Sequence, residues 1–258
     1  MLYNSCSIII CGYTSRFESV FMKEKIKALL KSILGRKLFF ALKAVYSRFY
    51  SYKNFYFSQF GEDVVLRVLI GSEQKTGFYV DVGAYHPKHL SNTFYFYKKG
   101  WRGINIDANP NAINLFNAVR SRDINVNAVI SSQAEQVTFY GWDSVYDTIS
   151  KTEAAEVRKN HGPEKWTKEV VTETLESVLD KFLPAGQCID ILTVDAEGLD
   201  LEVLKSNNWQ KYKPRFLVVE EHESDLEKIL SSEKVKYLNS LGYVLCSWTC
   251  VSLVFRCR

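Results

Sequence analysis

Three aspartates stand at the ends of apolar segments that have the length and composition of buried strands. Asp81 lies within the first segment, Asp107 is near the end of the second, and Asp195 directly follows a later one. In open parallel sheets, ligands bind in the crevice beyond the carboxyl ends of the strands. We therefore predict that the three carboxylates face one cleft, where they can bind hydroxyl groups or accept a proton.

The segment that contains Asp81 ends in the turn DVGAY at 81–85. Gly83 has no side chain at a point where the backbone must approach a ligand closely. The GxGxxG spacing that binds a pyrophosphate is absent, which argues against a nicotinamide oxidoreductase. Asp107, which lies 24 residues after Gly83, can accept hydrogen bonds from both hydroxyls of a ribose. A ribose-bearing cofactor without a pyrophosphate is favoured, although an aspartate after a strand is as often a helix cap.

These residues need a sheet to position them, and the pattern from residue 58 onward predicts one. Apolar segments alternate with helical ones, which is typical of a parallel sheet with crossover helices. The predicted strands are 77–83, 103–109, 124–130, 189–194 and 216–219, and the predicted helices are 62–70 and 111–119. The predicted class is α/β, with a mostly parallel, doubly wound sheet.

Two further regions complete the predicted domain. Short, exposed strands at 136–140 and 169–172 flank a polar region, 141–168, which we predict to be an insertion or substrate loop. The β-rich runs 243–248 and 251–256 predict a C-terminal antiparallel hairpin.

The net charge of +4 is unevenly distributed. Residues 16–53 hold ten lysines and arginines but only two acids, so the rest of the chain carries a net negative charge. A nucleic-acid binder spreads positive charge over its folded body, so we expect no nucleic-acid partner. We predict an N-terminal extension, 1–53, and a globular domain, 54–258.

The extension contains a predicted basic amphipathic helix at 23–50. This helix either contacts a membrane surface or a partner, or packs on its own domain. The apolar run at 8–11 has no basic segment before it, which argues against a signal peptide, and Met22 is a candidate start of the natural chain. The six cysteines form no CxxC pair, as is typical of reduced thiols. We expect a cytoplasmic protein, with a peripheral position at the inner membrane surface as an alternative.

Five sequence blocks point to one family: SQFGED (58–63), GFYVDVGAYHP (77–87), WRGINIDANP (101–110), VDAEGLDLEVLKSNNW (194–209) and FLVVEEH (216–222). In these blocks the sequence resembles the FkbM-type methyltransferases, a branch of the class I S-adenosylmethionine-dependent methyltransferases. The resemblance covers residues 58–222. It implies a Rossmann-like methyltransferase fold and methyl transfer from S-adenosylmethionine.

The resemblance also implies which residues bind the cofactor. By this resemblance the cofactor-binding residues are Gln59, Asp81, Gly83, Ala84, Tyr85, Asp107, Ala108 and Asn127. The turn around Gly83 would hold the methionine end, and Asp107 the ribose hydroxyls. Ala108 and Asn127 would lie at the adenine, and Gln59 would cap the carboxylate. Methyltransferases often carry more glycine in the first loop, where this sequence has Tyr85 and His86.

Methyl transfer to an alcohol benefits from a base that removes the hydroxyl proton during attack. The candidates for this catalytic role are His86, Asp195, Glu197 and His222. Asp195 has three other interpretations. It could hold a divalent cation together with a carboxylate from 220–221, lie near the cofactor's sulfonium, or cap the helix at 199–204. We do not favour the cation.

The acceptor is the least determined part of the prediction. Trp142, Tyr146 and Trp166 could line an acceptor cleft or simply pack the polar region. We expect an S-adenosylmethionine-dependent O-methyltransferase that acts on a hydroxyl of a small-molecule, sugar or glycan-precursor acceptor. The alternative is a catalytically inactive protein of the same fold that binds a partner.

Overall fold

The computed structural model describes residues 32, 38–42, 56–142, 144 and 146–258. The chain divides into two units, 1–55 and Tyr56–Arg258. In the first unit, residues 32 and 38–42 are helical, and the rest of the predicted basic helix at 23–50 lies outside the described residues. Among the helices that the structure describes, none is long and apolar enough to cross a membrane.

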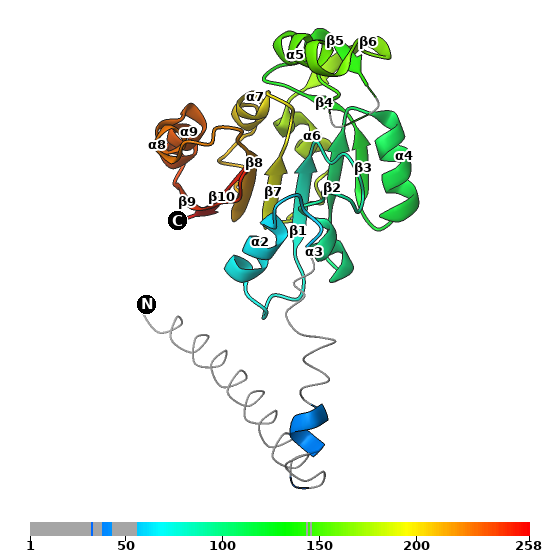
Figure 1. Cartoon of the computed structure of the whole chain (residues 1–258). Helices are drawn as coiled ribbons and strands as arrows, with labels where there is room; N and C mark the ends of the chain where they lie inside the picture. The colour runs from blue at the N-terminus through cyan, green and yellow to red at the C-terminus, as the bar shows by residue number, and fades with distance from the viewer. Residues whose placement is uncertain (1–31, 33–37, 43–55, 143, 145) are drawn as a thin grey trace. The chain divides into compact units, whose positions relative to one another are not determined.

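The second unit is built on a seven-stranded sheet (Figure 1). Its strand order is β3 (Ile124–Asn127), β2 (Arg102–Asp107), β1 (Phe78–Val82), β7 (Ile191–Val194), β8 (Phe216–Glu220), β10 (Ser252–Cys257) and β9 (Tyr243–Trp248). The strands from β3 to β8 are parallel, and β10 runs antiparallel to both β8 and β9. The predicted Rossmann-like α/β sheet with a C-terminal antiparallel hairpin is confirmed.

Helices cover both faces of this sheet. Strand β1 shows how, because successive side chains of a strand point to opposite faces. Tyr79 packs in one cluster with Leu66 and Phe96, whereas Val80 packs in the other with Leu175 and Val203. These clusters draw on α2 (Glu62–Ile70) and α3 (Phe94–Lys98) on one face, and on α6 (Leu175–Phe182), α7 (Asp200–Lys205), α8 (Leu226–Ser231) and α9 (Glu233–Ser240) on the other. The strand is buried along its whole length, as its sequence, apolar except for Asp81, predicts.

The helix that follows β2 begins with a capping residue and a proline, both typical of a helix N-terminus. Helix α4 (Pro110–Val119) starts at Asn109, whose side chain accepts a hydrogen bond from the backbone N–H of Asn111. Pro110 occupies the first helical position, where its missing N–H costs nothing. Asn109 therefore caps α4, which leaves the carboxylate of Asp107 for other partners.

A second, three-stranded sheet lies beyond one end of the main sheet (Figure 1). It consists of β4 (Val129–Ile130), β6 (Trp166–Glu173) and β5 (Gln136–Gly141). The predicted strand at 124–130 was therefore wrong in its extent. Residues 124–127 pair with β2 in the main sheet, whereas Val129 and Ile130 pair with β6.

The polar region at 141–168 contains a helix, α5 (Lys151–His161), which the sequence pattern did not predict. The side chain of Ser150 accepts a hydrogen bond from the backbone N–H of Glu153, and this Ser-x-x-Glu spacing is a capping-box signal. The few apolar residues of α5, Ala154 and Val157, pack on Trp142. Because these contacts are so few, the hydrophobic periodicity of the helix is weak.

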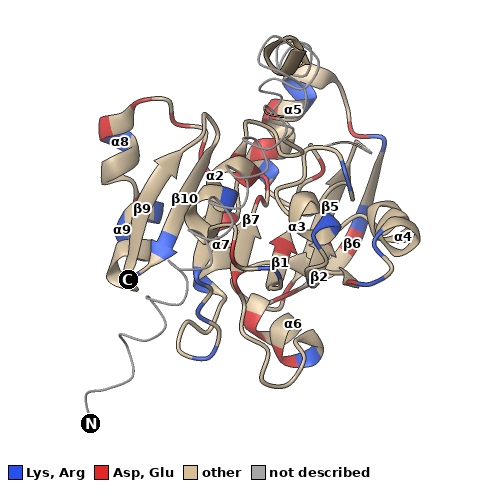
Figure 2. Cartoon of the chain, turned by 90° about the horizontal axis from the view of Figure 1, so that it is seen from below, with Lys and Arg blue, Asp and Glu red and all other residues tan. Residues whose placement is uncertain are grey.

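Charged side chains of the second unit are spread over many elements. Figure 2 shows lysines and arginines interspersed with aspartates and glutamates, rather than gathered on one helix or one face of the sheet.

Candidate active site

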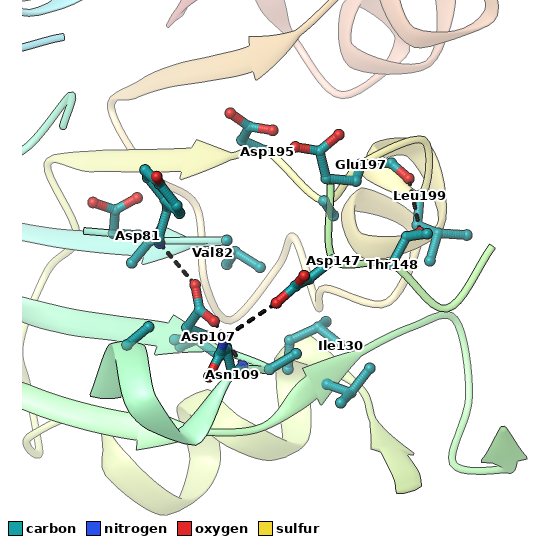
Figure 3. Close-up of a pocket in the computed structure, with 18 of the residues that line it drawn as sticks. Asp81, Val82, Asp107, Asn109, Ile130, Asp147, Thr148, Asp195, Glu197 and Leu199 are labelled. Atoms are coloured by element: carbon teal, nitrogen blue, oxygen red, sulfur yellow. Dashed lines mark hydrogen bonds between the residues drawn. The ribbon is translucent and has the colours of Figure 1, made fainter. Parts of the chain in front are cut away.

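A cavity of about 530 Å³ lies beyond the carboxyl ends of β1, β2, β7 and β8. This volume is typical of a small-molecule or cofactor site. It is lined by all the predicted site residues except His86 and Asn127. Figure 3 shows Asp195 and Glu197 on one side and Asp107 with Asn109 on the other, with Asp147 and Thr148 between them. The predicted convergence of Asp81, Asp107 and Asp195 on one cleft therefore holds.

The turn after β1 brings two sides of the cavity together at Gly83. The backbone N–H groups of Gly83 and Ala84 both donate to the carbonyl of Ile106, at 3.0 and 3.1 Å. Gly83 has a φ of +74°, and a Cβ at this position would lie 1.6 Å from the carbonyl oxygen of Asp195. Only glycine fits between the end of β1 and the segment after β7.

Asp81 is buried beneath this turn, and a chain of two hydrogen bonds holds its carboxylate. Its Oδ2 accepts a hydrogen bond of 2.7 Å from the hydroxyl of Thr93, and that hydroxyl accepts one of 2.8 Å from Nη1 of Arg120. Burial raises the pKa of Asp81, against the lowering effects of Thr93 and Arg120. Arg120 is fully buried, which could not be read from the sequence because an arginine beside polar residues gives no sign of burial.

Asp107 ends β2 with both carboxylate oxygens engaged. Oδ2 accepts from the backbone N–H of Tyr85 and Oδ1 from that of Asn109, each at 2.7 Å. Burial raises the pKa of Asp107 to about 6, against the lowering effect of these two bonds. A carboxylate oxygen has two lone pairs, so Asp107 can still accept hydrogen bonds from the cavity.

Two of the predicted binding residues, Gln59 and Asn127, line different cavities. Gln59 lines the cavity, on a segment held by the hydrogen bond of 2.9 Å from Ser58 to Asp63. Asn127 instead lines an adjoining cavity of about 420 Å³ that shares Ala108 with the first. Its Nδ2 donates to the carbonyls of Asp107 and Ala108, both at 2.9 Å. Asn127 thus fixes the loop after β2.

Three acids form a carboxylate cluster (Asp195, Glu197 and Glu220) at the ends of β7 and β8. Burial, followed by the charges of Glu220 and Glu197, raises the pKa of Asp195 well above its usual value. Burial and then the charge of Glu220 raise the pKa of Glu197 to about 8. Glu197 is therefore poised to hold or accept a proton near neutral pH.

His222 pairs with this cluster rather than acting as a free imidazole. Its Nε2 lies 3.1 Å from Oε1 of Glu220. The hydrogen bond to Glu220 raises the pKa of His222 to about 9. The imidazole is therefore protonated at neutral pH and cannot accept a second proton there, which favours a carboxylate as the base.

His86 is the one predicted catalytic residue that the structure keeps away from both cavities. Its Nδ1 accepts hydrogen bonds from the backbone N–H groups of Lys88 and His89, at 3.1 and 2.9 Å. Burial, followed by the charge of His89, lowers the pKa of His86. The structure thus places His86 at neither cavity, and its imidazole holds the turn after Pro87.

The polar region contributes cavity residues that the sequence did not single out. Asp147 accepts hydrogen bonds from the backbone N–H of Trp142 and from Nδ2 of Asn109, at 2.7 and 3.0 Å. The hydroxyl of Thr148 donates to the carbonyl of Glu197 at 3.3 Å. These bonds connect the polar region to both sides of the cavity.

The three aromatics of this region have separate positions. Tyr146 lines the main cavity and Trp166 the adjoining one, whereas Trp142 packs on α5. Only Tyr146 is thus placed as predicted for an acceptor cleft.

Three residues that line the cavity adopt backbone conformations that are rare for residues other than glycine. Tyr85 has a φ of 52°, Leu90 a φ of 54° and Glu197 a φ of 46°. Strain of this kind is concentrated at functional sites, where the surrounding structure enforces it. Among the residues that the structure describes, no group of three histidines, cysteines, aspartates or glutamates is arranged to hold a metal ion.

Comparison with protein families finds the methyltransferase FkbM domain over residues 81–245, which is more than half of the chain. The chain belongs to this family. The match begins at Asp81 and ends within β9, so the FkbM domain includes the Gly83 turn, Asp107 and the carboxylate cluster. None of the curated proteins matches the chain. The cavity described above is thus the candidate active site of an FkbM methyltransferase.

Proposed function

We propose that this FkbM methyltransferase transfers a methyl group from S-adenosylmethionine to a hydroxyl of a small-molecule or carbohydrate acceptor. One observation carries the proposal. The carboxylate cluster, in which the pKa values of Asp195 and Glu197 are raised, lies across the cavity from Asp107, the residue best suited to bind a ribose (Figure 3). A proton acceptor and a cofactor-binding group thus face the same space.

The residues on the Asp107 side suit this cofactor. Asp107 offers acceptors for the two ribose hydroxyls. Gly83, Ala84 and Tyr85 line the cavity, where this turn can contact the methionine end. Ala108 and Ala128 line both cavities and leave space for a flat base. When bound, the cofactor supplies an electrophilic methyl group on a positively charged sulfur.

The residues on the opposite side prepare the acceptor. Glu197 accepts the hydroxyl proton as the oxygen attacks, and its pKa of about 8 matches that task. The negative charge of Glu220 raises the affinity of Glu197 for the proton. Protonated His222 pairs with Glu220 and limits this effect. A general base of this kind contributes roughly 10²–10⁴-fold to the rate.

The oxygen specificity can be tested by following the transferred methyl group. The protein is incubated with S-adenosylmethionine that carries a ¹³C-methyl group, together with a panel of sugars, polyols and phenols. We expect labelled products whose carbon resonance is that of a methoxy group. Label on nitrogen, carbon or sulfur would contradict the proposed acceptor atom.

The raised pKa of Asp107 predicts a pH dependence of cofactor binding. The carboxylate is charged above about pH 6 and loses its charge as the pH falls. Because the charged form is the better acceptor for ribose hydroxyls, the Kd for S-adenosylmethionine should rise by up to about tenfold per pH unit below about pH 6. Calorimetry across this range measures it. In Asp107→Asn this dependence should disappear, and an unchanged Kd in the wild type would refute the role of Asp107.

A further inference from the structure

The lining of the main cavity is strongly unbalanced in charge. Among the described residues that line it, six are acids and none is a lysine or an arginine. His222 is the one lining residue that carries a positive charge at neutral pH. The acids are Asp81, Asp107, Asp147, Asp195, Glu197 and Glu220.

Three of these acids already have partners within the protein. Asp81 accepts from Thr93, and Asp107 accepts from two backbone N–H groups. Asp147 accepts from the backbone N–H of Trp142 and from Asn109. These carboxylates are thus largely satisfied by the fold, and they say little about the acceptor.

The carboxylate cluster differs, because its buried oxygens have no donor from the rest of the fold. Oδ1 of Asp195 and Oε2 of Glu220 accept no hydrogen bond from another described residue, and a hydrogen bond between the two carboxyl groups themselves requires a proton on one of them. The side chain of Glu220 is only 10% exposed, and its other oxygen pairs with His222. A buried acceptor without a donor costs about 1–3 kcal/mol. Both oxygens belong to residues that line the cavity, so a bound molecule that brings donors would remove this cost.

Cations near the cluster are already committed elsewhere. Lys234 pairs with Asp200 at 3.2 Å, donates to the carbonyl of Glu220, and does not line the cavity. An anionic acceptor would therefore find no lysine or arginine in the lining to balance its charge, and His222 already pairs with Glu220. A phosphate or carboxylate in this position would lose its hydration without gaining a free cationic partner.

The cofactor is one of two molecules that could bring donors to the cluster. Its methionine end has one ammonium group, whose three donors can engage these oxygens only if that end reaches the cluster. The acceptor is the other molecule that can bring donors here, and the variants described below distinguish the two.

We propose that the part of the acceptor that enters the cavity carries no phosphate or carboxylate and presents hydroxyl or amino donors beside the methylated oxygen. An unphosphorylated sugar, a polyol or an amino alcohol has this chemistry. A nucleotide-activated or phosphorylated sugar does not, unless its charged group stays outside. This inference rests on the proposed function, because it concerns the acceptor of the same site.

The labelled methyl group allows a test in which the natural acceptor identifies itself by becoming labelled. The protein is incubated with a deproteinised extract of the cells that make it and with S-adenosylmethionine that carries a trideuterated methyl group. The products are fractionated by anion exchange, and tandem mass spectrometry identifies the fragment that carries the label. We expect this fragment to be neutral or cationic. A label on a unit that bears a phosphate or carboxylate would overturn the inference while leaving methyl transfer established.

Absence of label in every fraction, from protein that binds the cofactor, would overturn the proposed function and this inference with it.

A pair of variants then tests whether the unpartnered oxygen of Glu220 binds the acceptor. Glu220→Gln replaces Oε2 or its partner oxygen by an amide, and the acceptor KM should rise about tenfold while the Kd for S-adenosylmethionine changes less than about twofold. Glu221→Gln is the matched control, because Glu221 does not line the cavity, and it should leave both constants unchanged. A change in cofactor Kd alone for Glu220→Gln would show that the oxygen serves the cofactor and would overturn the inference.

Discussion

Replacing Gly83 with alanine is expected to lower the free energy of unfolding by about 2–5 kcal/mol and to abolish cofactor binding. The new Cβ would lie 1.6 Å from the carbonyl oxygen of Asp195, and the backbone would be held at a φ of +74°. The atom in the way is backbone, so no side chain can rotate to relieve the overlap. The end of β1 or the segment after β7 must shift, and both form the cavity.

Gly186 offers a matched control for this substitution. It has the same φ of +74°, but a Cβ there would meet no atom within 4 Å. Gly186→Ala therefore isolates the backbone strain, which costs about 1–2 kcal/mol. Urea denaturation measures the stability of both variants, and calorimetry measures their binding of S-adenosylmethionine. Equal effects of the two substitutions would show that the contact between Gly83 and Asp195 does not matter.

The second large effect concerns Glu197. In the wild type, kcat/KM should rise with pH and level off above about pH 8, because Glu197 must lose its proton to act as a base. Glu197→Gln cannot accept the proton, so kcat should fall by about 10²–10⁴-fold, and the rise toward pH 8 should disappear. The Kd for S-adenosylmethionine should change little, since Asp107 lies on the opposite side of the cavity (Figure 3).

A control for charge alone is available nearby in the sequence. Glu202 lies in α7 and does not line the cavity, so Glu202→Gln should retain the wild-type rate and pH profile. If kcat/KM of Glu197→Gln still rises with pH as in the wild type, the proton acceptor is another group of the cluster. Asp195→Asn then becomes the decisive variant.

Much of the fold could be predicted because the central strands are buried on both faces. Such strands read as continuous apolar runs, and this property marked β1, β7 and β8. The positions of Asp81, Asp107 and Asp195 followed from topology alone, because the carboxyl ends of parallel strands meet at one edge. The short β4 could not be predicted, since its pairing with β6 depends on residues about 40 positions away.

The chemistry of the site was harder to predict because it depends on burial and on distant neighbours. His222 looked like a base with an ordinary pKa, but its contact with Glu220 holds it protonated. Glu197 looked like an ordinary glutamate, but burial and then the charge of Glu220 raise its pKa. His86 stands next to the Gly83 turn in the sequence, yet its backbone partners hold it outside both cavities.

Calorimetric titration with S-adenosylmethionine, comparing the wild type with Asp107→Ala, tests the central claim most directly. The account predicts saturable binding to the wild type. Loss of the two acceptor oxygens should raise the Kd by about a hundredfold, with thermal unfolding confirming that the variant is folded. Absence of binding at about millimolar cofactor, by wild-type protein shown to be folded, would contradict the account and favour a catalytically inactive protein that binds a partner.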